Sequence, residues 1–195
     1  MKHHFCTLLL LLTLLFVSTE ALAQPKHSIA FRPSWYNYIS PLASDNFEFA
    51  DIYNKTSGQG VDISYYNRVF KNSYLVIPFK LGVSSFVDDA GNLSRKELFT
   101  NLDVLFQHNF FKHGSVINPY LNAGIGSIYN IDNSDFGVNF PVSIGLNVRI
   151  LENLYASAQT QHRFSTNDQD GWHHGVGLHF FFGGEAPPPP ITDRD

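Results

Sequence analysis

Residues 138–150 read VNFPVSIGLNVRI and alternate without a break between apolar side chains and polar or small ones. One face of this segment carries Val, Phe, Ile and Leu, and the other carries Asn, Pro, Ser, Gly and Arg. Successive side chains of a β-strand point to opposite sides, so this period of two predicts a strand with one apolar face. The segment is about twice as long as the mean strand of a globular protein, which has roughly five or six residues.

The same period continues through most of the chain. Eight segments alternate, and they are residues 28–38, 60–69, 74–87, 97–110, 117–128, 138–150, 154–165 and 172–182. Between residues 28 and 182 no segment has the 3.6-residue period of a helix. The sequence therefore predicts an all-β fold of eight long strands.

The connections between these segments alternate in length. Short ones are expected near residues 70–72, 112–114 and 151–153, and longer, more polar ones at residues 39–59, 88–95, 130–136 and 166–171. Short turns at one end and longer loops at the other are typical of an up-and-down membrane barrel. We therefore predict an eight-stranded antiparallel up-and-down transmembrane β-barrel.

Composition favours an apolar face that points outward to lipid. Charged residues make up only 15% of the chain, against 44% hydrophobic and 15% aromatic residues. A soluble domain carries about 25% charged residues, and the polar face here is mostly Asn, Gln, Ser and Gly. The high aromatic content excludes a disordered chain, and the net charge of −4 excludes a strongly basic nucleic-acid binder. The alternative is a soluble, lipocalin-like carrier with its apolar face inside.

Seven charged residues fall singly on the polar face of the strands. They are Arg32, Asp62, Arg68, Lys80, Asp103, Arg149 and Arg163. The interior of an eight-stranded barrel is just wide enough to be filled by side chains, so we predict that these residues form an ion network that plugs the lumen. Five positive and two negative charges leave a surplus of positive charge, which either draws in water and anions or is matched by loop carboxylates.

The two ends of the chain differ from the barrel. A basic start, an apolar run over residues 5–17 and Ala21-Leu22-Ala23 predict a cleaved signal peptide over residues 1–23, and hence export to the outer membrane. The barrel domain is expected over residues 24–184. Residues 185–195 include Pro187–Pro190 and are expected to form an extended, proline-rich periplasmic linker.

Parts of the sequence resemble outer-membrane barrels of the OmpA-like type from Bacteroidota. Residues 118–126 (NPYLNAGIG) and 159–164 (QTQHRF) are similar to strands of that family. The last predicted strand resembles the signal that the barrel-assembly machinery reads, through His173, Gly175, Leu178, Phe180 and Phe182.

The resemblance also concerns partners and function. In this family a proline-rich linker is often followed by acidic calcium-binding repeats and a peptidoglycan-binding domain, and residues 193–195 (DRD) resemble the start of such a repeat. It implies a structural outer-membrane protein that, in a longer form, tethers the membrane to the cell wall. The expected partners are outer-membrane lipid and the assembly machinery, with peptidoglycan reached only through a domain absent from this sequence, and no nucleic acid. The alternative is a small pore or a carrier of a small ligand.

No motif indicates catalysis or a cofactor. Ser165 and His162 fall on opposite faces of one predicted strand and cannot pair locally. The same period separates His174 from His173 and His179, which argues against a metal site. Acidic residues such as Asp88, Asp89, Asp132 and Asp135 are expected to be solvated loop residues rather than calcium ligands. We expect no enzyme activity, no metal and no cofactor.

Overall fold

The computed structural model describes residues 26–38, 58–86, 96–166 and 170–183. The predicted signal peptide, the predicted linker and most of the connections at 39–59 and 88–95 lie outside the described residues. The strands are β1 (His27–Asn37), β2 (Gly58–Phe70), β3 (Ser73–Ser84), β4 (Glu97–Asn109), β5 (Ile117–Asn130), β6 (Asp135–Leu151), β7 (Leu154–Ser165) and β8 (Gly171–Phe182). In the described part of the chain, no helix is long and apolar enough to cross a membrane.

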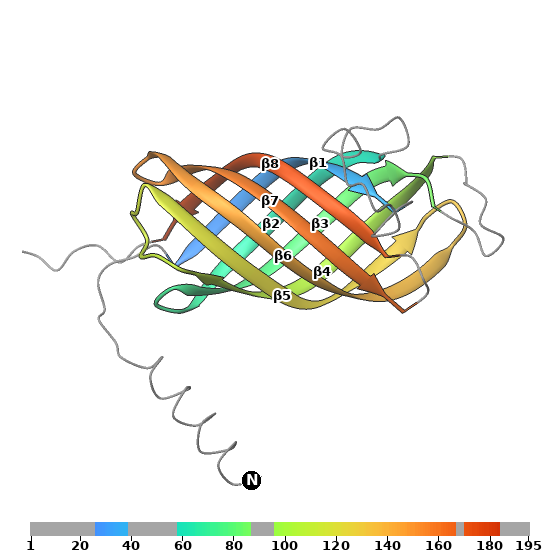
Figure 1. Cartoon of the computed structure of the whole chain (residues 1–195), viewed down its shortest axis with the longest axis horizontal. Helices are drawn as coiled ribbons and strands as arrows, with labels where there is room; N and C mark the ends of the chain where they lie inside the picture. The colour runs from blue at the N-terminus through green and yellow to red at the C-terminus, as the bar shows by residue number, and fades with distance from the viewer. Residues whose placement is uncertain (1–25, 39–57, 87–95, 167–169, 184–195) are drawn as a thin grey trace, which may run out of the picture.

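The eight strands form one closed barrel in sequence order (Figure 1). Every neighbouring pair is antiparallel, and β1 closes the sheet against β8, with His27 opposite Phe182 and Asn37 opposite Trp172. Closure leaves no free sheet edge, which is the condition for a sheet to span a bilayer. The predicted fold class is confirmed.

The barrel has two distinct ends. The turn end holds the connections 71–72, 110–116 and 152–153, together with the start of β1 and the end of β8. The loop end lies opposite, where β1 ends and β2 begins (Figure 1).

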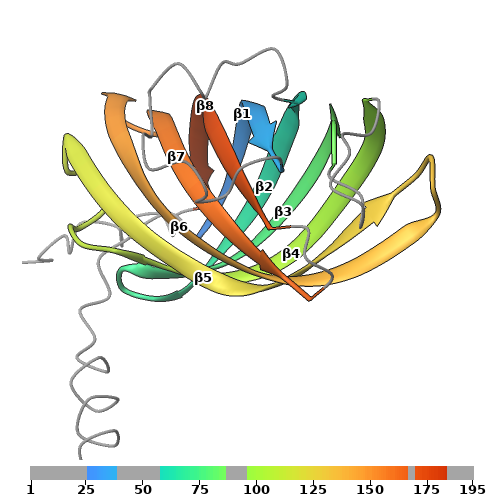
Figure 2. The same cartoon turned by 45° about the vertical axis from the view of Figure 1, so that its right-hand side comes forward.

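The loop expected over residues 130–136 is shorter in the structure, because both of its ends belong to the strands. Asn130 pairs with Asp135, so only residues 131–134 lie outside β5 and β6. The side-chain oxygen of Asn130 accepts the backbone N–H groups of Asp132 (3.1 Å) and Asn133 (3.2 Å), and Ser134 has a positive φ of 55°. These features close a tight turn, and the β5–β6 hairpin projects beyond the rim (Figure 2).

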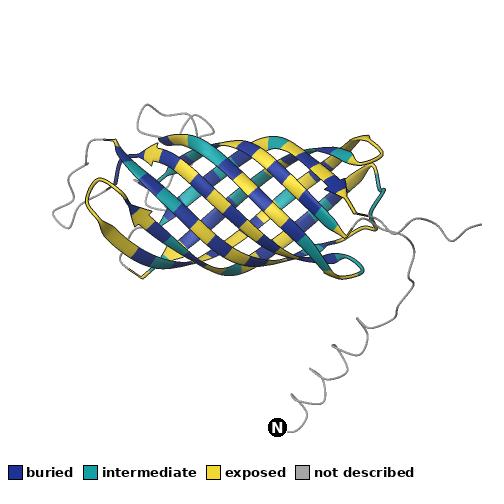
Figure 3. Ribbon diagram, turned by 180° about the vertical axis from the view of Figure 1, so that it is seen from behind, coloured by how far each residue is buried: buried dark blue, intermediate teal, exposed yellow. Residues whose placement is uncertain are grey.

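The outer face of the barrel is apolar along all eight strands. Buried and exposed residues alternate along each strand (Figure 3), and the outward side chains are mainly Val, Ile, Leu and Phe. Near the middle of the wall, Val104 of β4 and Ile144 of β6 are 47% and 58% exposed. A soluble barrel has the opposite arrangement, with its apolar face inside. The predicted direction of the alternation is therefore confirmed.

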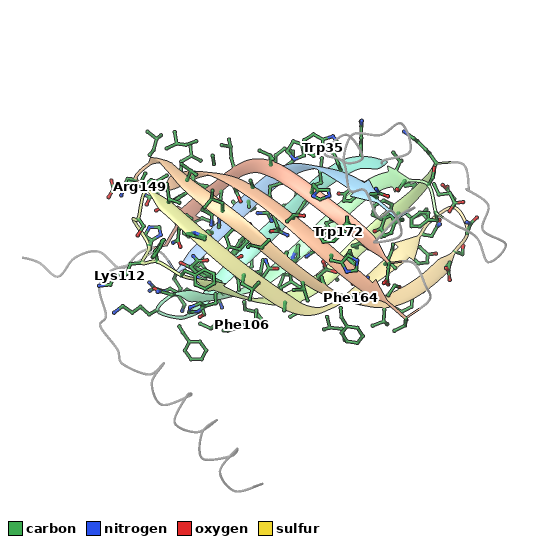
Figure 4. The ribbon with its side chains drawn as sticks, in the orientation of Figure 1. Trp35, Phe106, Lys112, Arg149, Phe164 and Trp172 are labelled. Atoms are coloured by element: carbon green, nitrogen blue, oxygen red, sulfur yellow. The ribbon has the colours of Figure 1, made fainter. Side chains whose placement is uncertain are left out.

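Aromatic side chains lie on the outside near both ends of the strands. Trp35, Phe164 and Trp172 lie toward the loop end and Phe106 toward the turn end (Figure 4). Tyr38, by contrast, is only 5% exposed and faces the interior. Its hydroxyl bonds to Nε2 of His173 at 2.6 Å, so an interior partner holds it there.

Candidate functional site: the barrel interior

The interior of the barrel, or lumen, is filled by three layers of side chains. Along β1, the inward residues run from Tyr36 at the loop end through Arg32 to Ala30 at the turn end. Along β4, the same order gives Phe99, Asp103 and Leu105. A polar, charged layer therefore lies between two largely apolar ones.

Asp103 is the centre of the charged layer. Its two carboxylate oxygens accept from both terminal nitrogens of Arg163, at 2.7 Å each, in a bidentate pair. Lys80 Nζ lies 3.6 Å from the same carboxylate. Lys80 and Arg163 also both donate to the side-chain oxygen of Gln161, and Arg163 donates to Asn139 at 2.5 Å. These side chains are almost fully buried, and bidentate, charge-assisted pairs are among the stronger hydrogen bonds in proteins.

A second ion pair adjoins the first. Arg32 donates to Asp62 at 3.3 Å, and also to the hydroxyls of Ser64 (2.7 Å) and Tyr66 (3.0 Å). Ser64 in turn donates to the other carboxylate oxygen of Asp62 at 2.5 Å. In the register, Asp62 stands between Arg32 on β1 and Lys80 on β3. The two ion pairs therefore belong to one layer.

The structure brings five of the seven predicted network residues together. Arg68 is half-buried and Arg149 is exposed, both at the turn end of their strands. In each strand the register shifts at this point, between Arg68 and Phe70 and between Arg149 and Leu151. Such irregularities re-aim side chains at a barrel rim. Placing Arg149 inside the lumen was therefore wrong, and the charged layer holds three cations and two carboxylates.

A layer of aromatic side chains closes the lumen on the loop side of the ions. It comprises Tyr36, Tyr38, Phe86, Phe99 and Ile128, with the ring of His173. The ring of Tyr36 lies 4.9 Å from that of Phe99 and 4.6 Å from that of His173, both edge-on. All of these side chains are buried.

A second such layer closes the turn side. It comprises Ala30, Tyr66, Tyr74, Val76, Leu105, Tyr155 and Phe181. His179 joins it, with its ring 4.3 Å from those of Tyr66 and Phe181, and donates or accepts at Ser28 (2.9 Å). His113 from the 110–116 connection packs against Phe181 at 4.6 Å.

Neither apolar layer was predicted from the sequence. Their members lie on the inward face of the strands, the same face that carries the Asn, Gln, Ser and Gly residues noted in the sequence. The glycines on this face could have indicated the layers, because a large inward-facing ring needs a residue without a side chain on a neighbouring strand. A Cβ on Gly82 would lie 2.4 Å from the ring of Tyr36, and one on Gly145 would lie 2.2 Å from the ring of Tyr120. The glycines provide the space that these rings fill.

Gly126 leaves space for a side chain of the ion layer in the same way. A Cβ there would lie 1.9 Å from Oδ1 of Asp103 and 2.9 Å from Oδ1 of Asn139. We expect Gly126→Ala to push Asp103 away from Arg163 and to destabilise the barrel in urea unfolding in detergent. Gly175→Ala is the matched control, because its new Cβ would meet nothing closer than the Ser34 hydroxyl at 3.0 Å. Equal stability of the two variants would contradict the tight packing around Asp103.

The other candidate residues do not converge on a site. His173 and His179 point inward and His174 outward, and no group of three or more His, Cys, Asp or Glu side chains among the described residues is placed to hold a metal ion. His162 lies between the rings of Phe164 (4.4 Å) and Trp172 (4.6 Å).

The acidic residues at 132 and 135 have structural roles. Asp132 accepts the backbone N–H of Leu98 at 2.7 Å. Asp135, expected in a loop, is the first residue of β6.

The last strand is amphipathic, as the predicted assembly signal requires. Leu178, Phe180 and Phe182 are exposed on the outer face, whereas His173 and Gly175 are buried on the inner face. Its recognition by an assembly machinery stays a prediction.

Comparison with known proteins supports the fold. No family model matches the chain, and no curated protein matches its sequence. OprG of Pseudomonas aeruginosa, an outer-membrane protein, has a similar structure with a TM-score of 0.58 at 8% identity, covering 82% of this chain and 97% of that one. Neisserial surface protein A gives a TM-score of 0.52 at 12% identity, over 84% and 100% of the two chains. The outer-membrane protein Ail of Yersinia pestis gives 0.50 at 14% identity, over 82% and 100%. At these identities the likeness establishes the barrel fold.

Proposed function

We propose that this chain is a structural outer-membrane protein whose barrel spans the membrane with a closed lumen. The observation that carries the proposal is the apolar outer face of a closed barrel, with the five charged residues of the ion layer turned inward. Lipid can cover such a face, and closure of the barrel gives the backbone N–H and C=O groups of every strand hydrogen-bond partners without water. Short turns at one end and the aromatic residues outside both strand ends support a transmembrane orientation with the turn end in the periplasm.

The contents of the lumen support a structural role over transport. Layers rich in buried aromatic side chains lie on either side of an ion layer, and no charged residue of that layer is more than 3% exposed. A pore would need a continuous polar path, and a carrier would need an internal cavity with few large side chains. We propose neither activity for this barrel, nor enzyme activity.

A longer form of the protein would give the barrel a mechanical role. The proline-rich residues 187–190 and their resemblance to OmpA-like proteins support tethering of the outer membrane to peptidoglycan through a further domain. The signal peptide over residues 1–23 would direct export, and the last strand would be read by the barrel-assembly machinery.

The experiment is heat modifiability of protein extracted from the outer-membrane fraction. We expect unheated protein in SDS to migrate faster than boiled protein, because a closed ladder of backbone hydrogen bonds resists SDS until it is heated. N-terminal sequencing of the same band should begin at Gln24. A protein that stays in the soluble fraction and migrates identically before and after boiling would refute the membrane barrel.

A further inference from the structure

The two ends of the barrel carry opposite charge. Among the described residues, the turn end holds five cations and one carboxylate, and these are Lys26, Arg68, Lys71, Lys112, Arg149 and Glu152. The described residues of the loop end hold four carboxylates and one cation, and these are Glu97, Asp132, Asp135, Asp170 and Lys96. The described parts of the two ends therefore form a positive rim and a negative rim.

The positive rim consists of residues that reach the surface. Lys26, Lys112 and Arg149 are exposed, and Arg68 and Lys71 are half-buried. Lys112 and Arg149 stand at the same extremity of the barrel in Figure 4. Burial lowers the pKa of His113 to about 4, and the positive charges of Arg68 and Arg149 act in the same direction. The rim thus has a positive field that His113, neutral at pH 7, neither adds to nor cancels.

Exposed apolar side chains lie beside the cations of the positive rim. Phe70, Phe110, Phe111, Leu151 and Phe182 are each 40–63% exposed at the turn end. Aromatic rings favour the boundary between hydrocarbon and headgroups, and long basic side chains extend past it to the charged groups of the lipid. Phe110 precedes Lys112 in the chain, and Phe182 pairs with His27, the residue after Lys26. Lys112 and Lys26 therefore lie just beyond aromatic side chains, at the level of the phosphates.

We propose that the turn-end rim binds the anionic headgroups of the phospholipid leaflet that it faces. This inference rests on the proposed membrane function and adds a partner, which is a lipid with net negative charge. Clusters of Lys and Arg next to a membrane attract anionic lipid by Coulomb forces, which act over about a Debye length and weaken with salt. The negative rim at the other end has the opposite effect, so the leaflet at the turn end is the one enriched in anionic lipid around the barrel.

The test measures the lipid shell around the folded, mature chain in bilayers. Spin-labelled phosphatidylglycerol or phosphatidylcholine is added as a trace to phosphatidylcholine bilayers containing the barrel, and the motionally restricted fraction is read by electron paramagnetic resonance. We expect a several-fold preference for phosphatidylglycerol in low salt that falls toward one in about 1 M salt, where the Debye length is about 3 Å. We expect the combined Lys71→Gln, Lys112→Gln and Arg149→Gln variant to lose most of that preference in low salt.

Two single variants serve as controls, each checked for folding by its heat-induced shift. Lys96→Gln removes a cation from the negative rim and should leave the preference unchanged, whereas Glu152→Gln should raise it. Equal restriction of both lipids by the wild-type barrel would overturn the inference. So would a preference that survives the triple variant or disappears in Lys96→Gln. If neither lipid is restricted, the proposed membrane-spanning function is refuted as well. That outcome therefore differs from the failure of the lipid preference alone.

Discussion

Replacing Asp103 with Ala will destabilise the barrel by about 3–5 kcal/mol, because it leaves buried cations without their carboxylate. Asp103 accepts two hydrogen bonds from Arg163 and lies 3.6 Å from Lys80, and all three side chains are almost fully buried. Lys80 and Arg163 are at most 2% exposed, so they would remain buried without a carboxylate. The measurement is equilibrium unfolding in urea in detergent micelles, followed by tryptophan fluorescence.

Lys80→Met is the matched comparison for that variant. It keeps the bidentate pair of Asp103 with Arg163 and removes the one cation in excess within the ion layer. Replacing a buried charge with an apolar side chain of similar length is often neutral or stabilising when the remaining charges stay paired. We expect a far smaller loss than for Asp103→Ala, and almost none for Glu152→Ala on the exposed 152–153 turn. Equal losses from Asp103→Ala and Lys80→Met would contradict the assigned pairing.

Val104→Arg will cost about 2–4 kcal/mol, because it places a charge on the outer face near the membrane midplane. Val104 is 47% exposed and lies in the middle of β4, opposite Ile125. Leu146→Arg should cost less, since Leu146 pairs with Pro119 close to the turn end, and the penalty falls toward the interface. The measurement is the free energy of unfolding in phospholipid vesicles.

The controls for this prediction separate the lipid face from the strand itself. Val104→Leu keeps the site apolar and should change the stability little. Asn147→Ser changes a lumen-facing side chain that is 2% exposed and should also be nearly neutral. If Val104→Arg proved no worse than Val104→Leu, the outer face would not be in contact with lipid.

The sequence was sufficient for the fold because the period of two is a property of the backbone. Segments such as 138–150 and 154–165 alternate so regularly that a shift by one residue would turn every apolar side chain inward. Strand number, direction and the outward face follow from that pattern. The ends of strands are less constrained, since a local hydrogen bond can extend a hairpin. The side chain of Asn130 does so at residues 131–134, where we expected a longer loop.

The contents of the lumen were only partly predictable. The charged residues on the polar face of the strands indicated an ion network. One layer of the lumen does hold Arg32, Asp62, Lys80, Asp103 and Arg163. Partners across strands depend on the register, which a single sequence does not give. Irregular pairing at the end of β6 places Arg149 outside the lumen. Inward-facing aromatic residues such as Phe99 were not recognised, because each face was judged by its most common residue types.

The most direct test of the closed lumen is the conductance of the purified wild-type barrel in a planar lipid bilayer. The ion layer and the two apolar layers predict no stable conductance at either sign of the voltage, although the heat-induced shift shows that the barrel is folded. A large, stable and anion-selective conductance would contradict the closed lumen and identify the barrel as a pore.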